Sequence, residues 1–307
     1  MDFDFSDDQQ SLRDAVSRWV DKGYGFERRR AIVEAGGCDR AAWNEIAELG
    51  LLGLAVPEAH GGMGFGAVEA MVVMEELGRG IVVEPYAAVA LVAAPLLAAT
   101  ADLPIAAQWL AGIADGSAIV VLAHQERRAR YRLAHVETKA VEAAPGKWQV
   151  SGAKSIVPAG AHAAGFIVPA RVNGAVGDPA GIALFAVAPG PGVTVRGYPT
   201  QDGACAAEVQ FDQASATLLV AADQNAFGAL EAAIDRGIAA TAAEAVGVMD
   251  KADPLVNRVP RSSGSLRTRR CDCAPVRAGR GIDRLCNFVT SGPRVRVCAR
   301  EIVRAQA

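Results

Sequence analysis

The spacing of apolar residues changes once along this chain, near residue 118, and that change limits the folds the chain can adopt. Before it, apolar residues such as Val16, Trp19 and Val20 recur every three or four positions, which is the spacing of an amphipathic helix. After it, short apolar runs of strand length are separated by turn residues every 8–15 positions. The pattern predicts a multidomain α+β protein in which a helical N-terminal part precedes an all-β part.

Five helices are predicted before residue 118. The first begins after Ser6, whose hydroxyl can accept backbone hydrogen bonds as an N-cap and which is followed by two aspartates. The other four share the helical spacing of apolar residues and are Arg40–Leu49, Ala67–Gly78, Tyr86–Ala99 with a kink at Pro95, and Ile105–Ala114.

Six later segments are predicted as strands because they are short, apolar and bounded by turn residues. They are Ile119–Ala123, Lys147–Lys154, Gly165–Ala170, Ile182–Val187, Val193–Val195 and Ala207–Phe211. Their spacing favours an antiparallel β-barrel or sandwich. The absence of strand–helix alternation and of a G-x-G-x-x-G string argues against a Rossmann fold. A further helix, about Asn225–Lys251, is apolar on several sides, as in a helical bundle.

The composition changes again near the C-terminus. From Arg258 to the end the chain holds twelve arginines, three acidic residues and no lysine, without a lasting apolar period. A basic arm for an anionic partner is one interpretation; the favoured one is a non-native tail that is disordered or read from a shifted frame. Four cysteines fall in this tail, but their spacing does not match paired C-x-x-C zinc knuckles, so no metal is predicted. The other two, Cys38 and Cys205, stand alone.

Charge and hydropathy exclude two classes of protein. The net charge of −3 gives no overall attraction to nucleic acid. The longest apolar stretch, Tyr86–Ala99, is too short to cross a bilayer, and residues 1–5 lack the basic head and apolar run of a signal peptide. A cytoplasmic location is expected, with no nucleic-acid partner and no membrane span.

A family resemblance rests first on one long string. Residues 49–66 read LGLLGLAVPEAHGGMGFG, and residues 74–78 read MEELG. The two are similar to the acyl-CoA dehydrogenase pattern ELGLLGL-x-PE-x-x-GG-x-G followed by EELGR. The opening Phe5–Gln10, the W-x-x-x-G-x-K string within Lys147–Lys154, and residues 202–212 also resemble that family, so the resemblance covers about residues 1–252. Residues 84–86, 123–126 and 198–203 resemble its pimeloyl-CoA dehydrogenase small-subunit branch.

The resemblance implies a domain plan and a reaction. The plan is a helical N-terminal domain at 1–117, a middle β-barrel at 118–217, the first helix of a C-terminal bundle at 218–253, and an Arg-rich non-family tail at 254–307. In such enzymes FAD lies between barrel and bundle. A Glu removes the α-proton of an acyl-CoA while the β-hydrogen passes to the flavin as hydride, giving a 2-enoyl-CoA. Implied partners are the acyl-CoA, a larger dehydrogenase subunit and an electron-transfer flavoprotein.

The resemblance also implies flavin contacts at His124, Gln125, Glu126, Ile156 and Pro158. Where the family has T-E-P-G-x-G-S-D, residues 125–131 read QERRARY, so only Glu126 matches and Gln125 takes the Thr place. Where the family has W-I-T-N-G, residues 156–160 read IVPAG, so Ile156 loses an aromatic contact and Pro158 has no N–H.

Substrate and catalytic residues are less complete. The string that ends in Arg236 is similar to the family's D-x-x-R at the start of the bundle, which implies a contact near the CoA thioester; a solvated helix charge is the equal alternative. No catalytic Glu is identifiable, because the family places it at or beyond the point where the resemblance ends, and Glu244 is interpreted as structural. His60 is interpreted as a surface loop residue. Three arginines, Arg127, Arg128 and Arg130, either meet CoA phosphates or form a solvated turn, the favoured interpretation.

The sequence thus predicts a small-subunit acyl-CoA dehydrogenase of fatty acid β-oxidation that is FAD-linked and works within a heteromer. One alternative is a non-catalytic subunit that supports the partner's flavin site. Another is an inactive truncated product whose bundle surface is exposed. Nucleic-acid binding by the basic tail carries the least weight.

Overall fold

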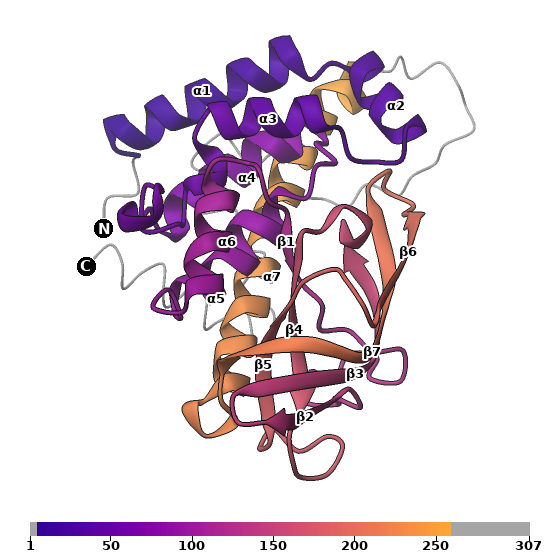
Figure 1. Ribbon diagram of the computed structural model, residues 1–307. Coiled ribbons are helices and arrows are strands. Elements are labelled where there is room, and N and C mark those ends of the chain that lie inside the picture. The colour runs from indigo at the N-terminus through magenta and orange to yellow at the C-terminus, as the bar shows by residue number, and fades with distance from the viewer. Residues whose placement is uncertain (1–4, 259–307) are drawn as a thin grey trace. The chain divides into compact units, whose positions relative to one another are not determined.

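The computed structural model describes residues 5–258 (Figure 1). These residues divide into two compact units: the first takes in 5–25, Met71–Val82 and 239–258, and the second is Phe26–Ala70 with Val83–Ile238. Among the described helices, none has the length and apolarity needed to cross a membrane. The predicted non-native tail lies almost wholly outside the described residues, as do its four cysteines.

The predicted helices are confirmed, with bounds that shift by a few residues. The α-helices are α1 (Asp7–Gly23), α2 (Phe26–Glu34), α3 (Arg40–Glu48), α4 (Ala67–Gly80), α5 (Ala94–Ala98), α6 (Pro104–Ala114) and α7 (Ala226–Arg258). The short turns are η1 (Leu51–Gly53), η2 (Glu58–His60), η3 (Ala87–Ala93), η4 (Gly160–His162) and η5 (Ala222–Gln224). The apolar pattern does not predict α2, because its residues Arg28–Arg30 are charged and only Ile32 is buried.

The segment predicted as one kinked helix over Tyr86–Ala99 is two pieces. Residues 87–93 form a π-helix, η3, and α5 begins directly after it. Pro95 lies in the first turn of α5, directly after the π-helical residues. The chain thus accommodates the proline by changing its helical register before it. Within the second unit, η3 packs against the first strand.

In the first unit, two glycines let α4 and α7 approach backbone to backbone. A Cβ on Gly78 would overlap the carbonyl oxygen of Glu244, and one on Gly247 would overlap that of Glu75. Arg13 of α1 donates to the Glu75 carboxylate at 2.6 Å, so α1 is tied to the same stretch of α4. Ser6 caps α1 as predicted: its hydroxyl accepts from the Gln9 amide at 3.2 Å.

The second unit carries all the strands found within residues 5–258. They are β1 (Val120–Leu122), β2 (Lys139–Ala144), β3 (Lys147–Pro158), β4 (Gly165–Arg171), β5 (Ile182–Val187), β6 (Val193–Pro199) and β7 (Cys205–Val220). Six of them contain the six predicted segments or their centres. β2 is not predicted because only Ala140 is buried in it, which gives no apolar run.

The strands pair in the order β1-β4-β2-β3-β7-β5, and a further pairing of β5 with β4 makes the chain of pairings return on itself (Figure 1). β6 pairs with β7 outside this path. The prediction of an antiparallel barrel needs one correction, since β4 pairs in parallel with both β1 and β2. The chain passes through β3 between β2 and β4, and through β2 and β3 between β1 and β4, which gives the length that connections between parallel neighbours need.

Candidate functional site

A buried carboxylate lies at the centre of the predicted site. Glu126 follows β1 and accepts four hydrogen bonds: from the Lys154 ammonium at 2.8 Å, the Thr138 hydroxyl at 2.7 Å, and the amides of Glu137 at 2.6 Å and Thr138 at 3.0 Å. Lys154 also donates to the carbonyl of Pro169 at 2.8 Å. The Lys154 side chain is fully buried and that of Glu126 is nearly so. The carboxylate therefore joins the loop before β2 to β3.

The charges of this pair are set by burial and by each other. Burial by itself raises the pKa of Glu126, but Lys154, Thr138 and the Glu137 amide outweigh it and hold that pKa below its usual range. Burial lowers the pKa of Lys154, and the Glu126 carboxylate acts in the opposite direction. Three of these donors bind Oε1, and Oε2 accepts from the Glu137 amide alone, so the carboxylate positions its neighbours mainly through Oε1.

His124 and Gln125 lie beside the pair with different roles. Burial, with a contribution from the Lys154 charge, lowers the pKa of His124 to about 4, so its imidazole is neutral at pH 7. The carbonyl of Gln125 accepts from the Ser155 amide at 2.8 Å, which fixes this segment to β3. The Gln125 carboxamide is partly exposed and has no hydrogen-bond partner within residues 5–258.

Ile156 and Pro158 project from β3 as exposed apolar side chains on either side of the buried Val157. Pairing with β7 shifts register between Lys154 and Val157, and Ile156 has a φ of 53°. A positive φ is costly for a β-branched residue, and such strain concentrates at functional sites. The bulge thus holds Ile156 outward, 53% exposed, instead of letting it pack.

Tyr198 of β6 joins this exposed patch. Its phenol lies in hydrogen-bonding reach of the Ile156 backbone and donates to Glu208 at 3.4 Å. Burial and the Glu208 carboxylate raise the pKa of Tyr198, while the nearby Arg127 charge lowers it. Arg127 is exposed, and its positive charge acts on the phenol of Tyr198.

The remaining predicted residues separate into two groups. Arg128 and Arg130 are exposed on the turn after Glu126, with Arg128 3.8 Å from the Glu137 carboxylate. Arg236 is exposed on α7, and within the described chain no hydrogen bond or ion pair joins it to the His124–Glu126 segment. Since Arg236 directly follows Asp235, their side chains leave the helix about 100° apart, unlike the members of a D-x-x-R string.

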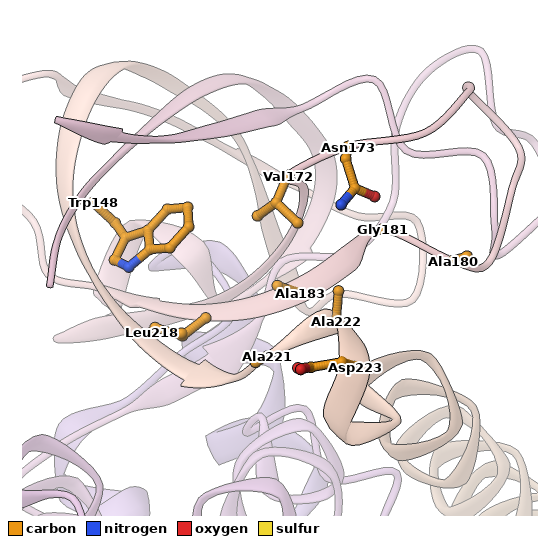
Figure 2. A pocket seen from close by; sticks show the side chains of 10 residues that line it. All are labelled: Trp148, Val172, Asn173, Ala180, Gly181, Ala183, Leu218, Ala221, Ala222 and Asp223. Atoms are coloured by element: carbon orange, nitrogen blue, oxygen red, sulfur yellow. The ribbon is translucent and has the colours of Figure 1, made fainter. Parts of the chain in front are cut away.

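Two cavities of the second unit lie apart from these residues. One has a volume of about 470 Å³, with the Trp148 indole on one side and the polar side chains of Asn173 and Asp223 on the other (Figure 2). The other, of about 410 Å³, is lined by His60 and Asp115 among small residues. No predicted flavin contact lines either cavity. His60 is accordingly half-buried at a hollow of the glycine loop.

One residue of the site, Thr138, carries no sequence signal. Thr138 has no recognisable motif around it, yet its hydroxyl is one of the four donors to Glu126. Gly152, the glycine of the W-x-x-x-G-x-K string, makes room for it: a Cβ there would stand 2.6 Å from the Thr138 hydroxyl oxygen. Lys154 closes the same string, so the string could have located the Lys154 end of the pair but not its partner.

Among the described residues, no three His, Cys, Asp or Glu side chains come together as metal ligands would.

The sequence has recognisable relatives. Residues 6–117 match the profile of the acyl-CoA dehydrogenase N-terminal domain. Acyl-CoA dehydrogenase FadE12 of Mycobacterium tuberculosis is 28% identical over 291 residues, covering 90% of this chain and 71% of that protein. Acyl-CoA dehydrogenase IpdE2 of the same organism is 36% identical over 118 residues, covering 38% of this chain and 36% of that protein.

The fold has close structural counterparts as well. The Tcur3481-Tcur3483 steroid ACAD variant superposes with a TM-score of 0.73 at 26% identity, covering 97% of this chain and 78% of that one. Butyryl-CoA dehydrogenase from Megasphaera elsdenii superposes with a TM-score of 0.77 at 21% identity, covering 87% and 72%. The second likeness is one of fold alone.

Proposed function

We propose that this chain is an acyl-CoA dehydrogenase, and that it is the small subunit of a heteromer that converts an acyl-CoA to a 2-enoyl-CoA with FAD. One observation carries the proposal: an apolar pair, Ile156 and Pro158, is held outward on a strained bulge beside the free carboxamide of Gln125. An exposed apolar surface of this kind is costly in water unless a ligand or partner covers it.

The residues present suit an isoalloxazine ring in their chemistry. Such a ring is flat and apolar on its faces, and it carries hydrogen-bonding groups along one edge. Ile156 and Pro158 would contact a face and exclude water from it, and Gln125 would bind the polar edge. Bound FAD would supply the hydride acceptor for the reaction. His124, neutral at pH 7, adds no charge next to the ring.

The turn after Glu126 offers charge for phosphates. Arg127 and Arg130 have exposed guanidiniums without an ion-pair partner in the described part of the chain, and Arg128 has only a long contact. Guanidiniums bind phosphate oxygens through paired hydrogen bonds. We propose that this turn meets the phosphates of FAD or CoA, and that Arg236 contributes near the thioester only if the substrate reaches α7.

The proton acceptor is proposed to come from the larger subunit. No carboxylate of the described chain corresponds to the family's catalytic Glu, and Glu126 is occupied by Lys154 and Thr138. The steroid dehydrogenase to which this chain is similar bears two protein names, which supports a two-protein assembly. The same proposal includes domains at 1–117, 118–217 and 218–253. It also includes a cytoplasmic location and the transfer of electrons to an electron-transfer flavoprotein.

A non-catalytic role within that heteromer is the second candidate. Pro158 favours it, because the family's residue in this place has an N–H and proline has none. In that case the Ile156 patch supports the partner's flavin site by packing alone, and the complex contains fewer flavins than subunits.

The visible absorbance of the purified chain, alone and with its larger partner, tests the proposal. We expect no flavin absorbance from the chain alone. We expect flavin absorbance from the complex, and this absorbance should decrease when an acyl-CoA is added. Gln125→Ala should lower the flavin content of the complex severalfold, whereas Gln108→Ala, an exposed glutamine on α6, should leave it unchanged. A complex that keeps its full flavin content in both variants would contradict the role of Gln125, and one that never bleaches would favour the non-catalytic subunit.

A further inference from the structure

Two free cysteines that are far apart in sequence approach each other in the second unit. Cys38 precedes α3, and Cys205 is the first residue of β7. Both thiols are half-buried and neither is in a disulfide. The turn between α2 and α3 therefore meets the hairpin between β6 and β7 at a place where each contributes one thiol.

The backbones next to these cysteines are in direct contact. A Cβ on Gly37 would overlap the carbonyl of Gly203 and stand 2.6 Å from the carbonyl carbon of Ala204. A Cβ on Gly203 would in turn stand 2.6 Å from the side chain of Val33. Only glycines allow this approach, and both have positive φ. The Arg29 guanidinium fastens the two segments by donating to the Asp202 carbonyl at 2.8 Å.

This packing sets an upper limit on the distance between the two cysteines. From the contact of Gly37 with Ala204 and standard backbone lengths, the Cα atoms of Cys38 and Cys205 are at most about 10 Å apart. Disulfides have Cα–Cα distances of about 4.4–6.8 Å. The thiols also interact electrostatically: after burial, the charge of Cys205 is the next largest cause that raises the pKa of Cys38, to about 12.

We propose that Cys38 and Cys205 are a reversible disulfide site, closed by a low-molecular-weight disulfide such as oxidised glutathione. One cysteine thiolate attacks the small disulfide, forms a mixed disulfide and releases one small thiolate. The other cysteine loses its proton and displaces the second small thiolate, which closes the Cys38–Cys205 bond. Two protons leave the protein, and its two electrons leave on the two small thiols.

The bond would connect the α2–α3 turn to the strand next to the bulge. The Cys205 carbonyl accepts from the Ala159 amide at 2.9 Å, and Ala159 ends the segment that carries Ile156 and Pro158. Because burial keeps the thiols protonated at pH 7, we expect slow closure that needs excess oxidant. The link itself requires no cofactor, so its test is independent of the function proposed above.

Peptide mapping of the full chain tests the link. The reduced protein is treated with oxidised glutathione, blocked with an alkylating reagent and digested with trypsin without reductant. After trypsin digestion, Cys38 lies on the peptide of residues 31–40 and Cys205 lies on the peptide of residues 197–236. Both peptides differ from every peptide that contains one of the four tail cysteines. We expect the 31–40 to 197–236 linkage to exceed any other linkage of Cys38 by at least about tenfold, because the packing gives the pair a high effective concentration.

The variants Cys38→Ser and Cys205→Ser should each abolish that linked species, and dithiothreitol should remove it from the wild type. Glutathione adducts on Cys38 and Cys205 without linkage would overturn the inference, as would pairing of either residue with a tail cysteine. Two thiols that stay unmodified in excess oxidant would overturn it too.

Discussion

At the scale of single residues, the Glu126–Lys154 pair shows how a family position acquires its role. The sequence resemblance predicts that Glu126 is a flavin contact, and the structure adds that its carboxylate accepts from Lys154, Thr138 and Glu137. A buried ion pair is stable only while both members and their hydrogen bonds are present. Glu126 thus acts on the site by fixing β3 and the segment at His124.

Removing one member of the pair should destabilise the protein more than removing both. Lys154→Met leaves the Glu126 carboxylate buried without its countercharge and should cost about 3–5 kcal/mol of unfolding free energy. Urea unfolding at pH 7 measures this cost. The double variant Glu126→Gln with Lys154→Met should be closer to wild type than Lys154→Met alone. If the double variant loses at least the sum of the two single losses, the pair is not coupled.

The lowered pKa of His124 predicts that the protein becomes less stable as the pH falls. Its folded pKa is about 4, below the unfolded value near 6.5, so the unfolded chain binds a proton first as the pH falls. Stability should therefore be lost between pH 6.5 and pH 4, by about 2–3 kcal/mol from this residue. Urea unfolding of wild type and of His124→Gln at pH 7 and pH 4.5 measures the part of the stability loss that His124 causes. Equal losses in both proteins would show that His124 is protonated normally in the fold.

At the scale of elements, sequence patterns located most helices and strands but missed those whose buried face is small. α2 and β2 each bury one residue of their pattern, so neither shows a helical or strand period. Their positions follow from neighbours instead: Arg28 of α2 binds both oxygens of Glu45 in α3, and β2 pairs with β3. The π-helix η3 likewise has the composition of an α-helix. Only its hydrogen bonds, such as that from the Ala94 amide to the Val89 carbonyl five residues earlier, distinguish it from one.

The contact between α4 and α7 should be intolerant of a single methyl group. Gly247→Ala would force its Cβ against the Glu75 carbonyl and separate the helices, at a cost of about 1–3 kcal/mol. Thermal unfolding followed by circular dichroism measures the effect. Gly237→Ala on the same helix is the matched control, because its Cβ meets only a Val92 methyl at 3.3 Å. It should be neutral or stabilising, since alanine favours helix over glycine. If Gly237→Ala lowers the thermal stability as much as Gly247→Ala does, the α4–α7 contact is not the cause of the loss.

At the scale of the whole molecule, the proposal places this chain in an assembly. Its exposed patch at Ile156 lacks the aromatic residue and the N–H that the family pattern supplies, and the sequence predicts that the catalytic Glu is not among its identifiable residues. Both features are understandable if a larger subunit completes the site. The extent of flavin loading in the complex is then the property that reports on the chain's contribution.

Restoring the family residues should raise that loading. The double variant Ile156→Trp with Pro158→Thr returns an aromatic ring and a backbone donor to the bulge. In complex with the larger subunit, this variant should have a higher flavin-to-protein ratio than the wild-type complex. The ratio should rise toward one flavin for each flavin site to which residues 156 and 158 contribute. The ratio is measured from visible absorbance and protein concentration. An unchanged ratio in a folded complex would mean that this bulge supports the partner without holding a flavin.

The sequence by itself determined the order of helical and strand segments and the similarity to acyl-CoA dehydrogenases, because these depend on local periodicity and on motifs contiguous in the chain. The flavin contacts at His124–Glu126, Ile156 and Pro158 remain predictions. Tertiary structure alone decided which strands pair, that Glu126 is occupied by Lys154 and Thr138, and that Cys38 lies near Cys205. Each of those depends on contacts between segments far apart in sequence. The pattern around each residue records whether it is buried, but not which distant residue buries it.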